Sequence, residues 1–176
     1  MKKPLPDIVK YGLKILFVGY NPGIESARRG HHYAHRSNRF WKLLHESGLT
    51  PERYSAEEDS KLLDLGFGST NIVDRPSRSE SEISRQELRD GAVSLHKLIS
   101  ELKPEIICYV GIGVYKAYAS QMLGIPVSRI KINTGLQPEP IVKGTQDFVC
   151  SNPSGLNTIP QDEQLECFRK LKEMLD

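Results

Sequence analysis

Residues whose side chains could do chemistry follow directly after a short apolar run. Residues 15–18 (Ile-Leu-Phe-Val) are typical of a buried strand, and Gly-Tyr-Asn-Pro-Gly comes next at 19–23. Asn21 can accept a hydrogen bond from water through its oxygen and donate through its amide, although it cannot serve as a strong general base. Pro22 and Gly23 restrict the turn behind it. The pattern favours a site that positions water, and the simpler alternative, a turn asparagine satisfied by nearby backbone, stays open.

Two further loops carry side chains that suit a nucleic-acid base. Tyr33 offers a flat aromatic face on which a base could stack. The sequence Asn-Pro-Ser-Gly-Leu-Asn at 152–157 repeats the Asn-Pro theme, and Leu156 at its tip could enter a base stack as an apolar wedge. Taken singly, each residue has a simpler interpretation, since a rim tyrosine can cover the core and a loop leucine can turn into it.

A third loop, Gly-Ile-Gly-Val-Tyr-Lys at 111–116, opens a predicted helix. Gly111 and Gly113 could bring backbone N–H groups close to a phosphate, or they could allow a strand and a helix to pack closely, and both interpretations remain. Lys116 stands where the dinucleotide fingerprint needs its third glycine. The Walker pattern is absent, which argues against an NTPase.

Residues 28–39 are rich in histidine and arginine. His31, His32 and His35 suggest zinc, but a fourth ligand at standard spacing is missing, so contacts to substrate or phosphate are favoured over a metal site. The arginines of this region suit contacts to DNA phosphates, and a solvated charge run is the alternative for the first two of them: Arg28, Arg29, Arg36 and Arg39.

Composition limits the class of protein. The chain has 176 residues, 38% hydrophobic, 26% charged, with a net charge of +2, which fits one domain spanning residues 1–176. No apolar run approaches the ~20 residues that cross a bilayer, and no apolar stretch follows the N-terminal lysines, so neither a membrane segment nor a secretory signal is expected. The cysteines are three, without a CxxC pair, which argues against disulfides and an iron–sulfur cluster and predicts a cytoplasmic protein, nucleoid-associated if bacterial or archaeal.

The elements that must position these loops alternate between strands and helices. Strands are predicted at 14–19, 105–111, 128–133 and 146–155, whereas 69–82 is predicted to be a loop around a short extended piece. The predicted helices lie at 37–48, 55–66, 84–103, 114–124 and 161–175, and Ser84 with Glu87 forms a capping box. We therefore expect a three-layer α/β/α fold with a central, mostly parallel sheet of four or five strands. Ligands of such sheets bind beyond the carboxyl ends of the strands, which are followed here by residues 19–37, 111–113 and 151–158.

Four motifs in order resemble one known family. They are Gly-Tyr-Asn-Pro-Gly at 19–23, GHHYAHRSNRFWKLL at 30–44, TNIVDRP at 70–76 and NPSGLN at 152–157. In type, order and spacing they resemble the mismatch-specific uracil- and thymine-DNA glycosylases, a branch of the uracil-DNA glycosylase superfamily. The resemblance covers nearly the whole chain.

The resemblance implies a role for each motif. Asn21 positions the water that attacks C1′ of a flipped deoxyribonucleotide, and Tyr33 stacks on the extruded base. The implied base pocket comprises Gly19, Tyr20, Gly23, Ser26, His32, Tyr33 and Asn71. The implied wedge and contacts to the orphaned guanine come from Ser154, Gly155, Leu156 and Asn157. Contacts to DNA phosphates are assigned to Gly111, Gly113, Lys116, Arg36 and Arg39.

The function implied is a monofunctional DNA glycosylase, because no lysine occupies the place of a nucleophile. It flips uracil opposite guanine, with thymine and ethenocytosine as further candidates, and hydrolyses the N-glycosidic bond in base excision repair. The expected partner is double-stranded DNA with a G:U or G:T mismatch, and we expect a monomer that needs no metal or other cofactor. The alternatives are a non-catalytic damage-binding protein on the same fold and an enzyme of free nucleotides that uses residues 111–116.

Overall fold

The centre of the molecule is a five-stranded sheet with the strand order β2-β1-β3-β5-β4. The structure, a computed structural model, describes residues 4–176. The first four strands in this order pair in parallel, and only β4 runs antiparallel to its neighbour, β5. The strands are β1 (Ile15–Gly19), β2 (Phe67–Asn71), β3 (Ile106–Val110), β4 (Gly135–Leu136) and β5 (Gln146–Cys150).

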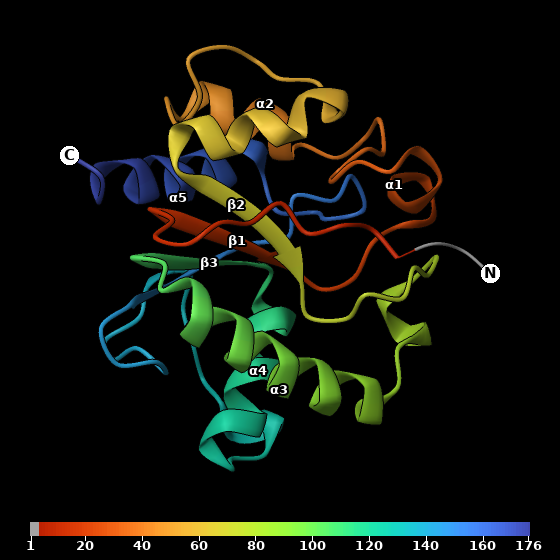
Figure 1. The fold of residues 1–176 in the computed structure, drawn as a ribbon, viewed down its shortest axis with the longest axis vertical. Helices are drawn as coiled ribbons and strands as arrows, with labels where there is room; N and C mark the ends of the chain where they lie inside the picture. Colours follow the sequence, from red (N-terminus) through yellow and green to blue (C-terminus); the bar gives the residue numbers. More distant parts are fainter. Residues whose placement is uncertain (1–3) are drawn as a thin grey trace.

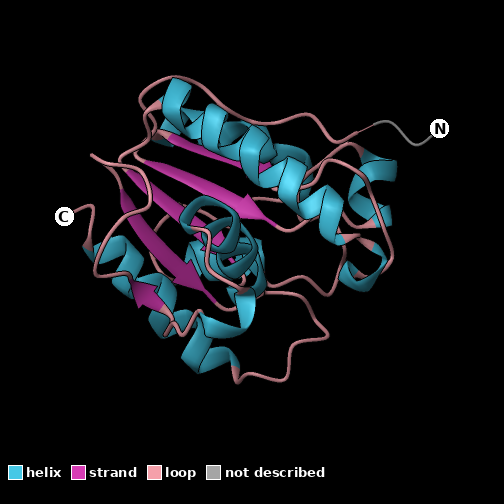
Figure 2. Cartoon of the chain, turned by 90° about the horizontal axis from the view of Figure 1, so that it is seen from below, coloured by secondary structure: helices cyan, strands magenta, loops and turns pink. Residues whose placement is uncertain are grey.

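Helices cover both faces of the sheet, so the predicted three-layer α/β/α fold is confirmed (Figure 1). One face carries α2 (Phe40–Glu46), the 3₁₀ helix η1 (Ala56–Leu65) and α5 (Gln161–Glu173), and the other carries α3 (Arg85–Leu102) and α4 (Ile112–Leu123). Seen from below, the long helix α3 runs along the strands (Figure 2). The remaining helices are short: α1 (Ile24–Arg29), η2 (Glu80–Glu82) and η3 (Val127–Arg129).

Alternating side chains of the strands fill two separate cores. In β1, Phe17 packs on the face of α2 and α5, whereas Leu16 and Val18 pack on the face of α3 and α4. All of these side chains are fully buried, which explains why β1 is a continuous apolar run rather than an alternating one. Cys108, Cys150 and Cys167 are free, buried thiols of the same interior.

Local signals set most helix ends as expected. Ser84 and Glu87 form the capping box at the start of α3, and Gly124 ends α4 in the left-handed conformation. Gly66 ends η1 in the same way. Asn38 accepts a hydrogen bond from Phe40 N at 2.9 Å, which supports the start of α2.

The predicted strand at 128–133 is wrong. Pro126 begins a 3₁₀ turn instead, in which Arg129 N donates to Pro126 O at 2.9 Å, and the chain then runs on without a strand partner to β4. Ile130 and Ile132 nevertheless pack on the core, so their alternation reflects burial of one side of an extended segment rather than pairing in a sheet.

Two elements that the sequence reading assigned to loops are regular structure. β2 was expected as a short extended piece within 69–82, but it pairs along its whole length with β1. Its polar residues are satisfied internally, since Ser69 pairs with His32 and Thr70 donates to Asp7 at 2.7 Å. Helix α1 lies within the predicted loop 19–37.

Candidate active site

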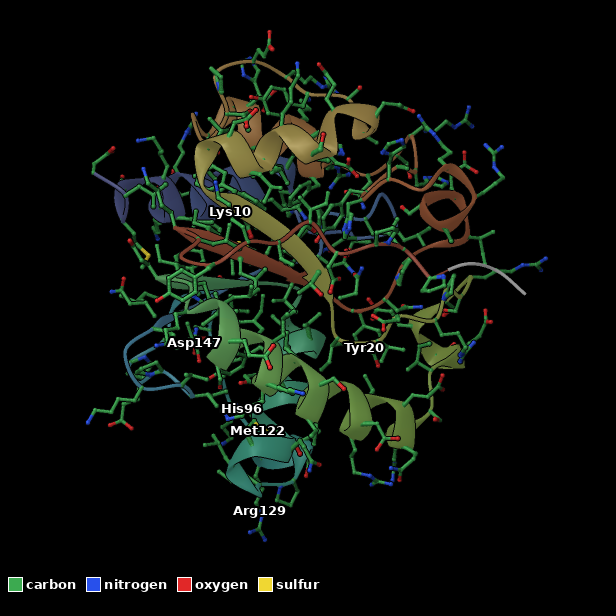
Figure 3. All side chains as sticks on the ribbon, in the orientation of Figure 1. Lys10, Tyr20, His96, Met122, Arg129 and Asp147 are labelled. Atoms are coloured by element: carbon green, nitrogen blue, oxygen red, sulfur yellow. The ribbon has the colours of Figure 1, made fainter. Side chains whose placement is uncertain are left out.

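A pocket of about 540 Å³ lies beyond the carboxyl ends of the parallel strands. Chain segments that follow β1, β2 and β5 line it, together with Val110 at the end of β3, as expected for a sheet whose order reverses on either side of β1. Tyr20 lies just past the arrowhead end of the sheet, whereas Asp147 lies near its opposite end (Figure 3). Of the predicted site residues, the pocket brings together Gly19, Tyr20, Asn21, Gly23, Ser26, His32, Tyr33, Asn71, Ser154 and Leu156.

The amide of Asn21 is held by its nitrogen. Asn21 Nδ2 donates to the backbone oxygen of Arg75 at 2.9 Å and to Ser77 Oγ at 2.7 Å. The carbonyl of Arg75 can only accept, so the NH₂ group must face it and the orientation of the amide is settled by chemistry. Asn21 Oδ1 accepts no hydrogen bond from residues 4–176 and is not buried, so it is left to bind water or ligand in the pocket.

The hydroxyl of Ser77 connects the Asn21 amide to the backbone at Ser79. Ser77 Oγ donates to the backbone oxygen of Ser79 at 2.7 Å, so it must accept, not donate, in its bond with Asn21. The sequence reading missed Ser77 and the backbone of Arg75. Nothing in the local pattern around 75–79 indicates contact with residue 21, because the two segments are brought together by the pairing of β1 with β2 and the bridge between Gly23 and Ser77.

Tyr33 forms one wall with its ring. The ring stacks on Phe40 with centroids 3.8 Å apart and planes 18° apart, so one face is covered, and the residue lines the pocket. Its backbone has φ of 52°, an uncommon conformation for a tyrosine. Its hydroxyl is buried without a hydrogen-bond partner among residues 4–176, and burial raises its pKa well above the usual value.

Gly19 is small because two pocket side chains approach its backbone. A Cβ at this position would lie 2.4 Å from Asn71 Oδ1 and 3.3 Å from the hydroxyl of Tyr33. Gly23, in contrast, would place a Cβ where no atom lies within 4 Å, so its backbone is open to a ligand. The two glycines of the first motif therefore differ in role, one allowing close packing and the other leaving open space.

Ser26 and His32 line the pocket, but their polar side-chain atoms form hydrogen bonds within the protein. Ser26 Oγ accepts from Ala34 N at 3.0 Å. His32 Nε2 lies 2.8 Å from the carbonyl oxygen of Pro6, which can only accept, so this nitrogen carries the proton. Nδ1 then accepts from Ser69 Oγ at 2.9 Å. Burial lowers the pKa of His32. The neutral ring thus connects residue 32 to Pro6 and to Ser69 of β2.

Two carboxylates reach the pocket, Glu25 and Glu80. Glu25 pairs with Arg28 at 2.6 Å, and this contact lowers its pKa. Glu80 accepts from Asn152 Nδ2 at 3.2 Å, and burial raises its pKa. Glu80 thereby links the wall at 75–82 to the loop after β5. The sequence reading did not single it out, and a glutamate in a polar run carries no signal of its own.

Leu156 is 91% exposed at the tip of the loop that follows β5. The loop is ordered by its own polar groups, since Asn157 Nδ2 donates to Asn152 O at 2.7 Å and Ser154 N donates to Asn152 Oδ1 at 2.9 Å. Gly155 packs so closely on the loop before α2 that a Cβ would lie 2.5 Å from Ser37 Oγ. The side chain of Leu156 therefore stands free on a braced loop, while Gly155 and Asn157 lie outside the pocket lining.

The residues assigned to DNA phosphates do not form one cluster around the pocket. Gly111 has φ of 134° at the N-cap of α4, a conformation that itself requires glycine. Arg39 NH1 donates to Gln164 Oε1 at 3.1 Å, so its guanidinium is engaged within the protein. Arg36 and Gly113 are exposed, and a Cβ added to Gly113 would lie 3.9 Å from the ring of Tyr20. Lys116 is half-buried on α4.

The histidine cluster is divided among structural partners. His31 Nδ1 lies 3.2 Å from Asp59 Oδ1, whereas His35 Nδ1 lies 2.8 Å from Ser37 Oγ. Within residues 4–176, no group of three or more His, Cys, Asp or Glu side chains is placed to hold a metal ion.

Residues 6–176 match the uracil DNA glycosylase superfamily. The chain belongs to this superfamily. Membership implies a DNA glycosylase, which is a hydrolase that acts on DNA.

A solved structure shows the same fold as this superfamily member. The solution NMR structure of a Methanosarcina acetivorans protein, named provisionally as a uracil DNA glycosylase, superposes with a TM-score of 0.62 at 23% sequence identity. The match covers 97% of this chain and 98% of that one. In residues 4–176 no helix is long and apolar enough to cross a membrane.

Proposed function

We propose that this superfamily member is a monofunctional, monomeric glycosylase that excises uracil opposite guanine from double-stranded DNA. It hydrolyses the N-glycosidic bond and leaves an abasic site. The observation that carries the proposal is the fixed amide of Asn21, whose nitrogen is bound to Arg75 O and Ser77 Oγ while its oxygen is free in the pocket. Such an oxygen can hold a water molecule in one place without removing its proton beforehand.

The chemistry requires little more from the protein. Cleavage builds positive charge on the sugar and negative charge on the departing base, and an oxocarbenium-like sugar needs only a well-placed water as nucleophile. Backbone N–H donors that face the base would stabilise the leaving anion, and the open backbone at Gly23 suits this role. In this proposal Tyr33 stacks on the flipped base with its free face.

Extrusion of the base is the other requirement. A base cannot react inside a duplex, and flipping it out costs a few kcal/mol, less in a mismatch. The exposed Leu156 would fill the gap and lose its own contact with water. This proposal gives a reason for a large apolar side chain on the surface of a braced loop.

The decisive experiment measures single-turnover release of uracil from a U·G duplex. Asn21→Ala is expected to slow excision by roughly a hundredfold or more, because the water loses its place, while duplex affinity changes little. Asn133→Ala, which changes an exposed asparagine outside the pocket, is the matched control. Excision by Asn21→Ala at the parental rate would disprove the catalytic assignment. A parental protein that binds the duplex but forms no abasic sites would instead be a damage-binding protein.

The range of bases needs a separate panel. Duplexes with uracil, thymine, ethenocytosine or hypoxanthine opposite guanine test the proposed preference, and we expect uracil to be released fastest. The wall that must accept a 5-methyl group or an etheno ring is formed by Gly19, Tyr33 and Asn71, which approach one another closely. Faster release of another base would leave the glycosylase activity in place and reassign its specificity.

A further inference from the structure

Gln164 is a buried polar residue outside the pocket whose role the proposed reaction does not explain. It lies in the first turn of α5, its side chain is 1% exposed, and it does not line the pocket. A buried amide is costly unless both ends are hydrogen-bonded, so its partners show what it is for.

The partners of Gln164 come from two loops that border the pocket. Gln164 Nε2 donates to the backbone oxygen of Asn152 at 3.0 Å, and Gln164 Oε1 accepts from Arg39 NH1 at 3.1 Å. A carbonyl can only accept and a guanidinium can only donate, so the amide has one possible orientation. One side chain therefore ties the start of the 152–157 loop to the segment that begins α2.

The same two loops are joined at two more places, and the 152–157 loop also has a bond of its own. Arg39 N donates to Pro153 O at 2.9 Å, and Gly155 lies against Ser37 with no room for a Cβ. The carbonyl of Asn152 that Gln164 holds also accepts from Asn157 Nδ2, the bond that closes the loop on itself. Gln164 thus supports the carbonyl on which the closure of the loop depends.

The position of Leu156 is set through the backbone of the 152–157 loop. Its side chain is almost wholly exposed and so gains no restraint from packing, and its backbone N donates to Ser154 Oγ within the same loop at 3.3 Å. A side chain that must enter a base stack has to be placed within a fraction of an ångström, and such precision comes from the residues that hold its backbone.

We propose that Gln164 is a positioning residue that sets the 152–157 loop, and with it Leu156, for entry into the DNA base stack. This inference rests on the proposed glycosylase function. Arg39 takes part in the same arrangement. Its guanidinium donates to Gln164 Oε1, and its backbone N donates to Pro153 O.

The first test examines the free protein and needs no activity. Gln164→Met keeps the shape of the side chain and removes both hydrogen bonds, and Gln164→Glu keeps an acceptor for Arg39 but removes the donor to Asn152. In both variants we expect amide hydrogen exchange at residues 154–159 to become at least about tenfold faster, with little change in β1 and β3. Gln161→Met, in the same helical turn, is the control and should leave exchange in the loop unchanged. Unchanged exchange in Gln164→Glu would overturn the proposal, even if Gln164→Met failed to fold.

The second test asks whether Gln164 acts through Leu156. Affinity for a duplex with an abasic site opposite guanine is expected to fall about tenfold in Gln164→Met and in Leu156→Ala, and by little more in the double variant. Losses that multiply in the double variant would show that Gln164 does not act through Leu156. A parental protein that excises no uracil would refute the proposed function, whereas the exchange experiment would still decide whether Gln164 holds the loop.

Discussion

At the scale of single residues, one buried polar group beside the pocket has no hydrogen-bond partner among residues 4–176. The Tyr33 ring is well used, since it stacks on Phe40 with one face, and the residue lines the pocket. Its hydroxyl is buried and unpaired among residues 4–176, although an unpaired buried polar group typically costs about 1–3 kcal/mol. The ring and the hydroxyl of this tyrosine can therefore be separated by experiment.

Tyr33→Phe is expected to raise the free energy of unfolding by about 1 kcal/mol and to retain excision, because it removes only the unpaired hydroxyl. Urea denaturation measures the first effect and single-turnover release of uracil the second. Tyr118→Phe is the matched control, since the Tyr118 hydroxyl pairs with His96 Nδ1 at 2.8 Å and its removal should destabilise the protein. A loss of stability in Tyr33→Phe as large as that in Tyr118→Phe would contradict this account.

At the scale of elements, the site depends on how closely the ends of β1 and β2 approach each other. Gly19 and Asn71 are paired at the last register position of these strands, and Asn71 Oδ1 occupies the space of the missing Gly19 side chain. The sequence reading identified both residues by their motifs. The sequence could not show that Asn71 requires a glycine at position 19, because the two residues are separated by η1 and about fifty residues of chain.

Gly19→Ala is expected to destabilise the protein by about 1–3 kcal/mol, because the new Cβ overlaps Asn71 Oδ1. Excision should fall with it, since the overlap displaces the pocket wall. The double variant Gly19→Ala/Asn71→Ala should recover part of the lost stability, as the second change removes the overlapping atom. Thermal unfolding of the three proteins checks this, and a double variant less stable than Gly19→Ala would show that the contact with Asn71 is not the cause.

At the scale of the whole molecule, His32 binds three distant segments, two through its ring and one through its backbone. Its Nε2–H donates to Pro6 near the N-terminus, its Nδ1 accepts from Ser69 in β2, and its backbone N donates to Asp59 in η1 at 2.9 Å. Protonation of the ring would leave Nδ1 unable to accept. Burial separately lowers the pKa of His32, because removal from water disfavours the charged form of the ring.

The free energy of unfolding should therefore depend on pH through His32. Below the ordinary pKa of 6.5 the unfolded chain binds a proton that the folded chain does not, so stability is present above about pH 6.5 and is lost as the pH falls toward the lowered pKa. The slope is at most about 1.4 kcal/mol per pH unit. His32→Gln should remove this part of the dependence in urea titrations between pH 5 and 8, while the exposed control His45→Gln retains it. Equal slopes in the parental protein and His32→Gln would rule out this role.

Local patterns along the chain were sufficient to predict much of the fold. Continuous apolar runs predicted β1, β3 and β5, and the capping box at Ser84 with the glycine after Leu123 predicted the ends of α3 and α4. These signals are local because an apolar run and a helix cap each consist of residues that are close together in the sequence. β2 was not recognised as a full strand, since its polar residues find partners only in His32 and Asp7, far away in sequence.

By itself, the sequence placed Asn21 and Tyr33 in a loop beyond the carboxyl end of the first strand of a parallel sheet, and the resemblance of the motif at 70–76 added Asn71 to the same pocket. Only the tertiary structure decided what each polar atom does there. It turned the nitrogen of Asn21 toward Arg75 and Ser77 and engaged Arg39 with Gln164 instead of leaving it free. The physical reason is that a hydrogen bond needs its two atoms within about 3 Å in the correct orientation, and distances between remote segments exist only once the sheet has formed.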